Sequence, residues 1–305
     1  MKIIRDITDT TDKPKAITIG NFDGVHKGHQ SLIKKTKDIA VDGGLESLVF
    51  TFSRLPQEVF KKKDFNRLND NNLKFSYIEE FNIDTILSID FNEIKEYSAD
   101  FFCEEVLIKK LNIKYLVIGH NFKFGKDREG NINKLKDYHN EGHFELIMPD
   151  LEQYNNENIS STRIRTLLEQ GKLFEVEKCL GRAYELNGVV TSGEKLGRKL
   201  GYPTANISLE HDYPLDGVFL SKIEVNGKCH FALSSIGNKP TYQGKEKLLE
   251  VFILDFNEDI YGKNVKVYFF EKIRNQIKFE NDNDLIKQMN EDHKYVIINS
   301  KKYGI

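Results

Sequence analysis

The chain has 305 residues, of which 30% are charged and 39% hydrophobic, and its formal net charge is -2 at pH 7. This length is sufficient for two domains of ordinary size, and the composition is typical of a soluble globular protein. The near-neutral charge gives no reason to expect nucleic acid as the main partner, so an anionic substrate would need a local positive site.

The cysteines and the first residues exclude several other classes of protein. Cys103, Cys179 and Cys229 lie far apart without a CxxC pair, which argues against a zinc site or a disulfide framework and favours a reducing cytosol. Residues 1–15 mix charges and lack the apolar core of a signal peptide, and no run approaches the roughly 18 apolar residues of a membrane span. We therefore expect a cytoplasmic protein with small-molecule partners and no membrane, as a monomer or weak homo-oligomer.

The first half of the chain alternates short β-rich runs with helical patterns. The clearest helical pattern covers 98–111, with Ser98 as its candidate N-cap, whereas the polar segment 61–74 is expected to be a loop or an exposed helix. Such alternation predicts a parallel sheet flanked by helices. The expected strands are 16–20, 47–52, 83–89, 115–119 and 144–149.

From about residue 183 the pattern changes to strands in quick succession. Asn226-Gly227 separates two of them, which is a strong signal for a two-residue hairpin. This part predicts a small antiparallel barrel or sandwich, followed by a helical pattern over 281–296. The boundary rests on the change of period, and we place the two domains at 1–182 and 183–305. The expected strands are 184–193, 217–225, 228–237, 248–256 and 264–273.

Two histidines follow a glycine-containing turn in the stretch "ITIGNFDGVHKGHQSLI" (17–33). A helix that begins near His26 would direct its unpaired backbone N–H groups at a bound anion. His26 and His29 would share one helix face, and Gly28 would let a ligand approach the backbone. Two imidazole donors there suit the charge that develops on a transferred phosphate group. Metal binding is the alternative, but a third ligand at a useful spacing is missing.

A second candidate motif is "ISSTRIR" (159–165). The hydroxyl residues Ser160, Ser161 and Thr162 can cap a helix that begins there. Arg163 and Arg165 add fixed positive charge beside the same helix start, where it suits the triphosphate of ATP.

The second half contains a glycine-rich segment, "GEKLGRKLGYPTAN" (193–206). Its spacing fits neither the Walker P-loop nor a GxGxxG dinucleotide loop. Backbone N–H groups and positive side chains could still surround phosphates, and Thr204 and Asn206 offer oxygen ligands for a magnesium ion shared with ATP. The glycines are Gly193, Gly197 and Gly201, and the cations are Lys195, Arg198 and Lys199.

Glu250 lies in the strand pattern "LLEVFILDF" (248–256). Alternation places it on one face with Phe252 and Leu254, and neither face of this strand is polar. A carboxylate at the edge of an apolar face would have a raised pKa suited to accepting a hydroxyl proton. The alternative is a charge at the strand end that reaches solvent, and Asp255 is expected to be structural.

In this order along the chain, the motifs resemble those of the prokaryotic bifunctional riboflavin kinase/FAD synthetases. "GNFDGVHKGH" resembles the HxGH signature of nucleotidylyltransferases, and "ISSTRIR" resembles the second motif of that module. The glycine-rich segment, "SIGNKPTY" (235–242), "LLEVFILDF" and "IYGKNVKVYFFEKIR" (260–274) resemble riboflavin kinase. The resemblance implies a Rossmann-like α/β nucleotidylyltransferase domain, followed by a small antiparallel β-barrel kinase domain with a terminal helix.

The resemblance also implies two reactions that use ATP and Mg²⁺. Riboflavin is phosphorylated to FMN with Glu250 as the base, and FMN is adenylylated to FAD and pyrophosphate beside His26 and His29. Thr204 and Asn206 are the implied metal ligands, and Asn121 and Arg274 are the implied flavin contacts. The implied ATP contacts are Gly20, Phe22, Asp23, Gly28, Ser161, Thr162 and Arg165 in the adenylyltransferase, and Gly193, Lys199 and Gly201 in the kinase.

Three positions depart from the family pattern. Asn121 stands where an Asp is usual, "TFSRLPQEVF" (51–60) lacks a Pro-His-Pro element, and Gln276 stands where a Glu is common. Two alternatives therefore stay open: a riboflavin kinase with a weakened or lost adenylyltransferase, and a non-catalytic flavin-binding regulator.

Overall fold

The computed structural model describes residues 1–60, 65–192, 202–241 and 244–304. The chain forms two compact units. The first contains 1–65 and 71–160, and the second contains 66–70 and 161–305. The expected boundary at 182/183 would assign residues 161–182 to the first domain instead, and that boundary stays a prediction.

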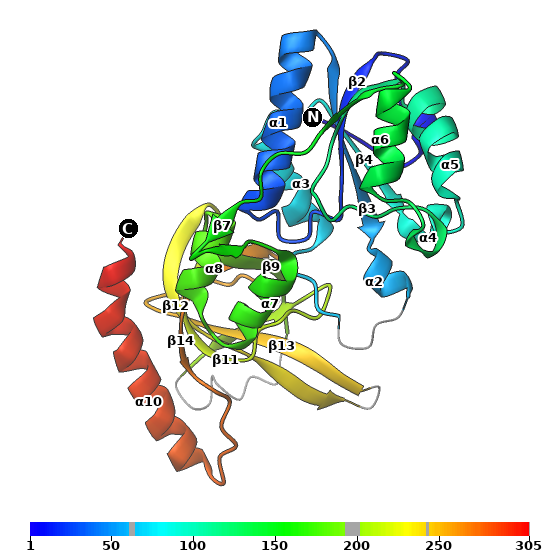
Figure 1. Cartoon of the computed structure of the whole chain (residues 1–305). Helices are drawn as coiled ribbons and strands as arrows, with labels where there is room; N and C mark the ends of the chain where they lie inside the picture. The colour runs from blue at the N-terminus through cyan, green and yellow to red at the C-terminus, as the bar shows by residue number, and fades with distance from the viewer. Residues whose placement is uncertain (61–64, 193–201, 242–243, 305) are drawn as a thin grey trace. The chain divides into compact units, whose positions relative to one another are not determined.

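The first unit is built on a six-stranded sheet in which every neighbouring pair is parallel (Figure 1). The strand order is β1-β4-β3-β2-β5-β6. Strands β3 and β4 therefore extend the sheet on one side of β2, and β5 and β6 extend it on the other side, so the strand order reverses at β2. This confirms the predicted parallel sheet, although the sequence analysis missed the three-residue β1. The strands are β1 (Lys2–Ile4), β2 (Lys15–Ile19), β3 (Glu46–Arg54), β4 (Thr85–Asp90), β5 (Ile113–Val117) and β6 (Glu145–Ile147).

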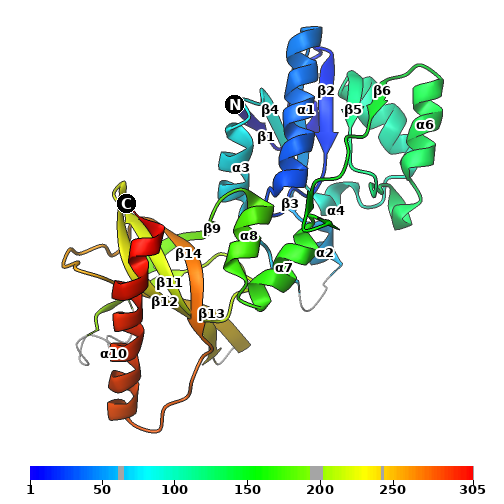
Figure 2. The ribbon, with the colours of Figure 1, turned by 60° about the vertical axis from the view of Figure 1, so that its left-hand side comes forward.

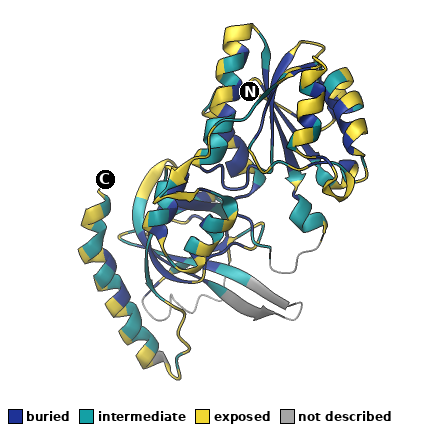
Figure 3. Ribbon diagram, in the orientation of Figure 1, coloured by how far each residue is buried: buried dark blue, intermediate teal, exposed yellow. Residues whose placement is uncertain are grey.

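Helices cover both faces of this sheet, and each face has its own apolar core. One core joins the sheet to α1 (Lys27–Gly43) and α3 (Asn71–Glu79), and the other joins it to η2 (Phe102–Lys110) and α6 (Ile132–Asn140). Figure 3 shows the buried strands between helices whose outer faces are exposed. Short elements complete the unit: η1 (Ile7–Asp9), α2 (Pro56–Val59), α4 (Phe91–Ile94), α5 (Ala99–Phe101), η3 (Lys126–Arg128), β7 (Gln153–Tyr154) and β8 (Glu157–Asn158).

The helix predicted over 98–111 is present, with Ser98 as its N-cap. The Ser98 hydroxyl accepts a hydrogen bond from the Phe101 N–H at 3.1 Å. After α5 the helix widens into the π-helix η2, and the Leu111 N–H bonds the Val106 carbonyl at 2.9 Å. Hydrophobic spacing did not distinguish this π-helix from an α-helix.

The polar segment 61–74 differs from its predicted exposed state. Residues 61–64 lie outside the described residues, but Arg67, Asn69 and Asp70 are buried, and α3 begins at Asn71. Lys74 is only 2% exposed, and its Nζ donates to the Phe52 carbonyl at 2.7 Å. The expected loop is present over 65–70, but the expected exposure was wrong because these polar side chains are hydrogen-bonded inside the protein.

The second unit contains a closed six-stranded antiparallel barrel. Of the two predicted architectures, a barrel or a sandwich, the barrel is therefore confirmed. Its order is β10-β13-β12-β11-β14-β9. Asn226 and Gly227 both have positive φ and form the predicted two-residue turn between β11 and β12. Strand β10 was not among the strands expected from the sequence. The strands are β9 (Tyr184–Thr191), β10 (Thr204–Ser208), β11 (Gly217–Val225), β12 (Lys228–Thr241), β13 (Gly244–Ile253) and β14 (Asn264–Arg274).

In the described residues of this unit, four helical elements accompany the barrel. The long helix α10 runs beside it (Figure 2), and Val296 of α10 packs with Val218, Leu220 and Leu233 of the strands. The elements are α7 (Ser161–Glu169), α8 (Leu173–Leu180), α10 (Asp282–Asn299) and η4 (Ser300–Tyr303). All three cysteines are free thiols. No helix in the described parts of the chain is both long and apolar enough to traverse a membrane.

Candidate active sites

The turn between β2 and α1 has an unusual backbone. Phe22, Gly24 and Val25 all have positive φ, at 48°, 84° and 36°. Such values are costly for a β-branched residue such as Val25, so the surrounding structure must hold the turn in place. The turn leads directly into α1, which begins at Lys27, as predicted from the sequence.

His26 is the N-cap of α1 as well as a candidate catalytic residue. Its Nδ1 accepts a hydrogen bond from the His29 N–H at 3.3 Å. Because Nδ1 must be unprotonated to accept, the proton of a neutral His26 lies on Nε2. The two imidazole rings are stacked, with their centroids 3.6 Å apart and their planes at 18°. The predicted shared face is therefore confirmed.

His29 is held as a neutral imidazole. Burial is the largest cause of a pKa well below 6.5, and the neighbouring His26 and Lys74 lower the pKa further. Its Nδ1 is buried without a hydrogen-bond partner among the described residues. Because His29 is neutral, the site does not carry two imidazolium cations.

Gly28 and Gly20 leave space for aromatic rings of the turn. A Cβ at Gly28 would lie 3.3 Å from Cε1 and Nδ1 of His26, and one at Gly20 would lie 3.2 Å from Cζ of Phe22. Phe22 and Asp23, both predicted to contact ATP, are buried in the same turn. The small residues thus let His26 lie flat over the start of the helix, in addition to the predicted backbone approach.

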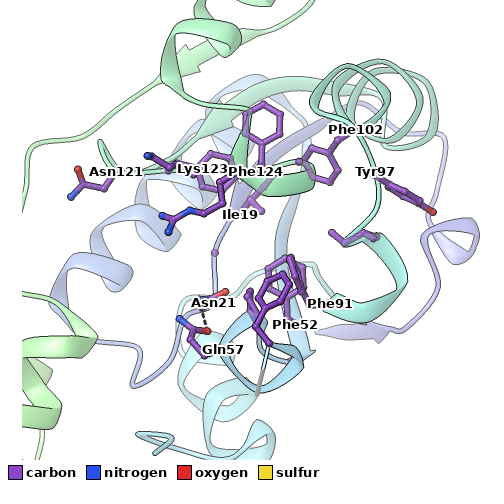
Figure 4. A pocket seen from close by; sticks show the side chains of 17 residues that line it. Ile19, Asn21, Phe52, Gln57, Phe91, Tyr97, Phe102, Asn121, Lys123 and Phe124 are labelled. Carbon is purple, nitrogen blue, oxygen red and sulfur yellow. Dashed lines mark hydrogen bonds between the residues drawn. The ribbon is translucent and has the colours of Figure 1, made fainter. Parts of the chain in front are cut away.

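A cavity of about 350 Å³ opens at the carboxyl ends of β2, β3 and β5 (Figure 4). This is the place where the strand order reverses, and doubly wound sheets bind ligands there. Gly20 and the predicted flavin contact Asn121 both line the cavity, with Asn121 exposed at its rim. Seven of its 17 lining residues are aromatic: Phe52, Phe60, Phe91, Tyr97, Phe102, Phe122 and Phe124.

Sequence reasoning missed this aromatic wall. "TFSRLP" and "NFKFG" were compared with the family pattern only at the departing positions. Phe52 lies near the carboxyl end of β3, and Phe122 and Phe124 follow β5, so their position at the strand ends was the available signal.

The second motif begins a helix as predicted, because α7 starts at Ser161. Arg165 donates from Nε to the Asn66 carbonyl at 2.7 Å, within the second unit. Ser161 and Thr162 lie in the first turn of the same helix. Their contacts with ATP remain predictions.

In the barrel, strand register brings three predicted residues together. Asn206 of β10 is the Cα partner of Glu250 on β13, and Thr204 is the partner of Phe252. Directly paired residues point to the same face of a sheet, so Thr204, Asn206 and Glu250 share one face. The intervening Leu249, Val251 and Ile253 are buried on the opposite face, which confirms the predicted alternation.

The side-chain oxygens on this face are of the kind that bind Mg²⁺, so they fit the predicted magnesium ion. Thr204 and Asn206 provide hydroxyl and amide oxygens beside the carboxylate of Glu250, and Mg²⁺ bound to ATP phosphates needs only a few such protein ligands. All three side chains are half-buried. The predicted phosphate contacts Gly193, Lys199 and Gly201 lie outside the described residues.

Arg274, the predicted flavin contact of the barrel, is anchored by α10. Its Nε lies 3.0 Å from Oδ2 of Asp292, and its second terminal nitrogen lies 2.7 Å from the same oxygen. Asp292 is 2% exposed and also accepts a hydrogen bond from Gln288. Gln276 donates to the Ser235 hydroxyl at 3.0 Å, and Ser235 is the other strand neighbour of Glu250.

The fold and these sites define a chain of two nucleotide-handling domains, one doubly wound and one a closed barrel. Comparisons with known proteins agree: the family model for FAD synthetase matches residues 8–163, and the model for riboflavin kinase matches residues 180–298. The chain belongs to the family of bifunctional riboflavin kinase/FMN adenylyltransferases.

Named relatives support this membership over the whole chain. The protein of that name from Buchnera aphidicola subsp. Schizaphis graminum is 40% identical, and the match covers 99% of each chain. The Haemophilus influenzae protein of that name is 38% identical over 91% of each chain. A crystal structure described as a macrolide-efflux protein from Streptococcus pneumoniae is 31% identical, with a TM-score of 0.83 over 96% of this chain and 97% of that one.

Proposed function

We propose that the chain phosphorylates riboflavin to FMN on its barrel domain and adenylylates FMN to FAD on its first domain. We assign the adenylyltransferase to residues 1–182 and the kinase to residues 183–305. The proposed adenylyltransferase activity rests on the turn between β2 and α1. Its first residue, Gly20, lines an aromatic cavity, and the turn ends in the stacked His26–His29 pair.

The kinase step follows from the Glu250 face of the barrel. Glu250 takes the proton of the ribityl 5′-hydroxyl, the hydroxyl oxygen bonds the γ-phosphorus of ATP, and ADP leaves with the electrons of the broken P–O bond. Thr204 and Asn206 would hold Mg²⁺, which supplies positive charge to the ATP phosphates. Arg274, fixed by Asp292, would orient the flavin.

The adenylyl step uses no nucleophile of the protein. A phosphate oxygen of FMN bonds the α-phosphorus of ATP, and pyrophosphate leaves. His26 and His29, as neutral donors at the start of α1, stabilise the charge that develops on the phosphate oxygens. Ser161, Thr162 and Arg165 would bind the triphosphate.

The cavity favours FMN despite the Asn121 departure. Its volume of about 350 Å³ and its aromatic wall suit a flat ring system. Lys123 and Arg128 also line it, and the described lining contains no Asp or Glu. Asn121 therefore leaves the rim without a carboxylate that would repel the phosphate of FMN. We further infer a cytoplasmic location, in agreement with the three free thiols.

The test is chromatography of flavins after incubation with ATP and Mg²⁺. We expect riboflavin to give FMN and then FAD, and FMN to give FAD with one equivalent of pyrophosphate. FMN without FAD would support the kinase-only alternative, and no conversion of either flavin would support a non-catalytic flavin binder.

A further inference from the structure

One wall of the aromatic cavity is a loop, residues 121–130, here called the cavity loop. Phe124 and Gly130 pair across it, with N–H to carbonyl distances of 3.1 and 3.0 Å. Between them, Asp127 and Arg128 have positive φ, at 52° and 61°. Two successive non-glycine residues in this region are unfavourable, so contacts outside the loop must hold its shape.

Those contacts come from the turn between α4 and α5. The Lys126 N–H donates to the Tyr97 carbonyl at 2.7 Å, and the Ala99 N–H donates to Oε1 of Glu129 at 2.8 Å. A Cβ at Gly125 would lie only 2.8 Å from the Ala99 nitrogen, so the two backbones are already in contact. The Lys126–Glu96 ion pair is exposed and adds little to this attachment.

Glu129 satisfies a backbone group that the helix itself cannot satisfy. Ala99 is the first residue of α5, and its N–H is one of the unpaired donors of a helix start. Ser98 bonds the Phe101 N–H instead, so the Glu129 carboxylate completes the cap. Ala99 is fully buried whereas Glu129 is exposed, and the bond between them is charge-assisted.

The residues beside this bond form neighbouring parts of the cavity wall. Tyr97 and Phe102 flank Ala99 in the chain, whereas Phe122 and Phe124 belong to the cavity loop. The Phe102 and Phe124 ring centroids are 5.7 Å apart. The Glu129–Ala99 bond therefore fixes the spacing between the two groups of rings.

We infer that Glu129 is a positioning residue for flavin binding, since it ties the cavity loop to Ala99 and so holds the Phe102 and Phe124 rings side by side in the cavity wall. Glu129 itself is not among the residues that line the cavity. This inference rests on the proposed adenylyltransferase activity, and it predicts an effect on FMN affinity rather than on the chemical step.

The experiment compares Glu129→Ala, Glu129→Gln and a control, Glu141→Ala, which changes an exposed glutamate of the same unit. We expect the KM for FMN in FAD formation to rise about three- to tenfold in Glu129→Ala, the range of one lost hydrogen bond. The kcat, the KM for ATP and the riboflavin kinase activity should stay within about twofold of the wild type. Glu129→Gln keeps an acceptor oxygen and should recover most of the affinity, and the control should match the wild type.

Hydrogen exchange of the cavity loop provides a readout independent of activity. Glu129→Ala should speed exchange of the Lys126 and Gly130 amides and leave the barrel amides unchanged. An unchanged KM for FMN, or a fall in kcat equal to the rise in KM together with a lower Tm, would overturn the inference. A wild type that makes no FAD refutes the proposed function, and unchanged loop exchange in Glu129→Ala would then refute the positioning role separately.

Discussion

His29 differs from a surface histidine because the folded protein opposes its protonation. Its pKa lies well below 6.5 in the folded state, so the unfolded chain binds the proton more readily at mildly acidic pH. The free energy of unfolding must therefore fall as the pH drops below about 6.5 towards the folded-state pKa, by at most about 1.4 kcal/mol per pH unit from this group.

His29→Asn should reduce this acid sensitivity, because asparagine does not titrate. We expect the difference in Tm between pH 7.5 and pH 5.5, measured by scanning calorimetry, to be smaller for the variant than for the wild type. The comparison uses the slope with pH, so a uniform loss of stability in the variant does not affect it. Equal slopes would show that His29 is protonated as readily in the folded state as in the unfolded state.

Glu250 is tested by a substitution that keeps its shape and removes its basicity. Glu250→Gln should lower FMN formation from riboflavin by about 100-fold or more, because the general base is lost. FAD formation from FMN should be unchanged, and the exposed Glu258→Gln provides the control. Near-normal kinase activity in Glu250→Gln would instead favour the alternative of a charge at the strand end that reaches solvent.

At the scale of elements, α10 is attached to the barrel by a buried ion pair. Asp292 is 2% exposed and faces Arg274 of β14, so its replacement leaves a charged guanidinium unpaired. Asp292→Ala should destabilise the second unit by about 3 kcal/mol and raise the KM for riboflavin. Thermal unfolding and kinase kinetics measure both effects, with the neighbouring exposed Glu291→Ala as the control. An unchanged Tm would mean that the apolar contacts of Val296 alone anchor the helix.

The elements that sequence predicted best are those with a clear apolar period. The strands at 47–52 and 217–225 agree with β3 and β11, because their side chains pack on a sheet along most of their length. In contrast, β10 was missed, since Thr204–Ser208 is a short polar stretch that becomes a strand only by closing the barrel. The burial of 67–70 depends on partners distant in sequence, such as Asp212, whose carbonyl accepts from the Arg67 N–H, so a local pattern could not show it.

In the candidate sites, too, features set by neighbouring residues could be predicted from the sequence, whereas features that depend on residues distant in the chain could not. The spacing of His26 and His29 predicted a helix start and a shared face, because both depend only on nearby residues. The low pKa of His29 involves Lys74, which comes from α3 and was expected to be exposed. Likewise, the position of Asn206 opposite Glu250 needed the register between β10 and β13.

At the scale of the whole molecule, the two reactions can be separated and recombined by mutation. His26→Asn keeps a good N-cap for α1 but removes the imidazole donor. This variant should convert riboflavin to FMN but should not convert FMN to FAD. Glu250→Gln should make FAD only when FMN is supplied. A mixture of the two variants should produce FAD from riboflavin, because FMN released by one protein can diffuse to the other. Absence of FAD in that mixture, with each variant active alone, would show that FMN passes within one chain.

The closed barrel has a consequence for synthesis of the chain. Its first strand, β9, is completed on one side by β10 and on the other by β14, the last strand to leave the ribosome. Until β14 emerges, β9 has an unpaired edge, and the face that carries Glu250 belongs to an open sheet. Such non-local closure is slow compared with helix formation. The nascent chain must therefore protect this edge for longer than any other part of the barrel, and we expect truncation before residue 264 to leave the barrel open, since it removes β14.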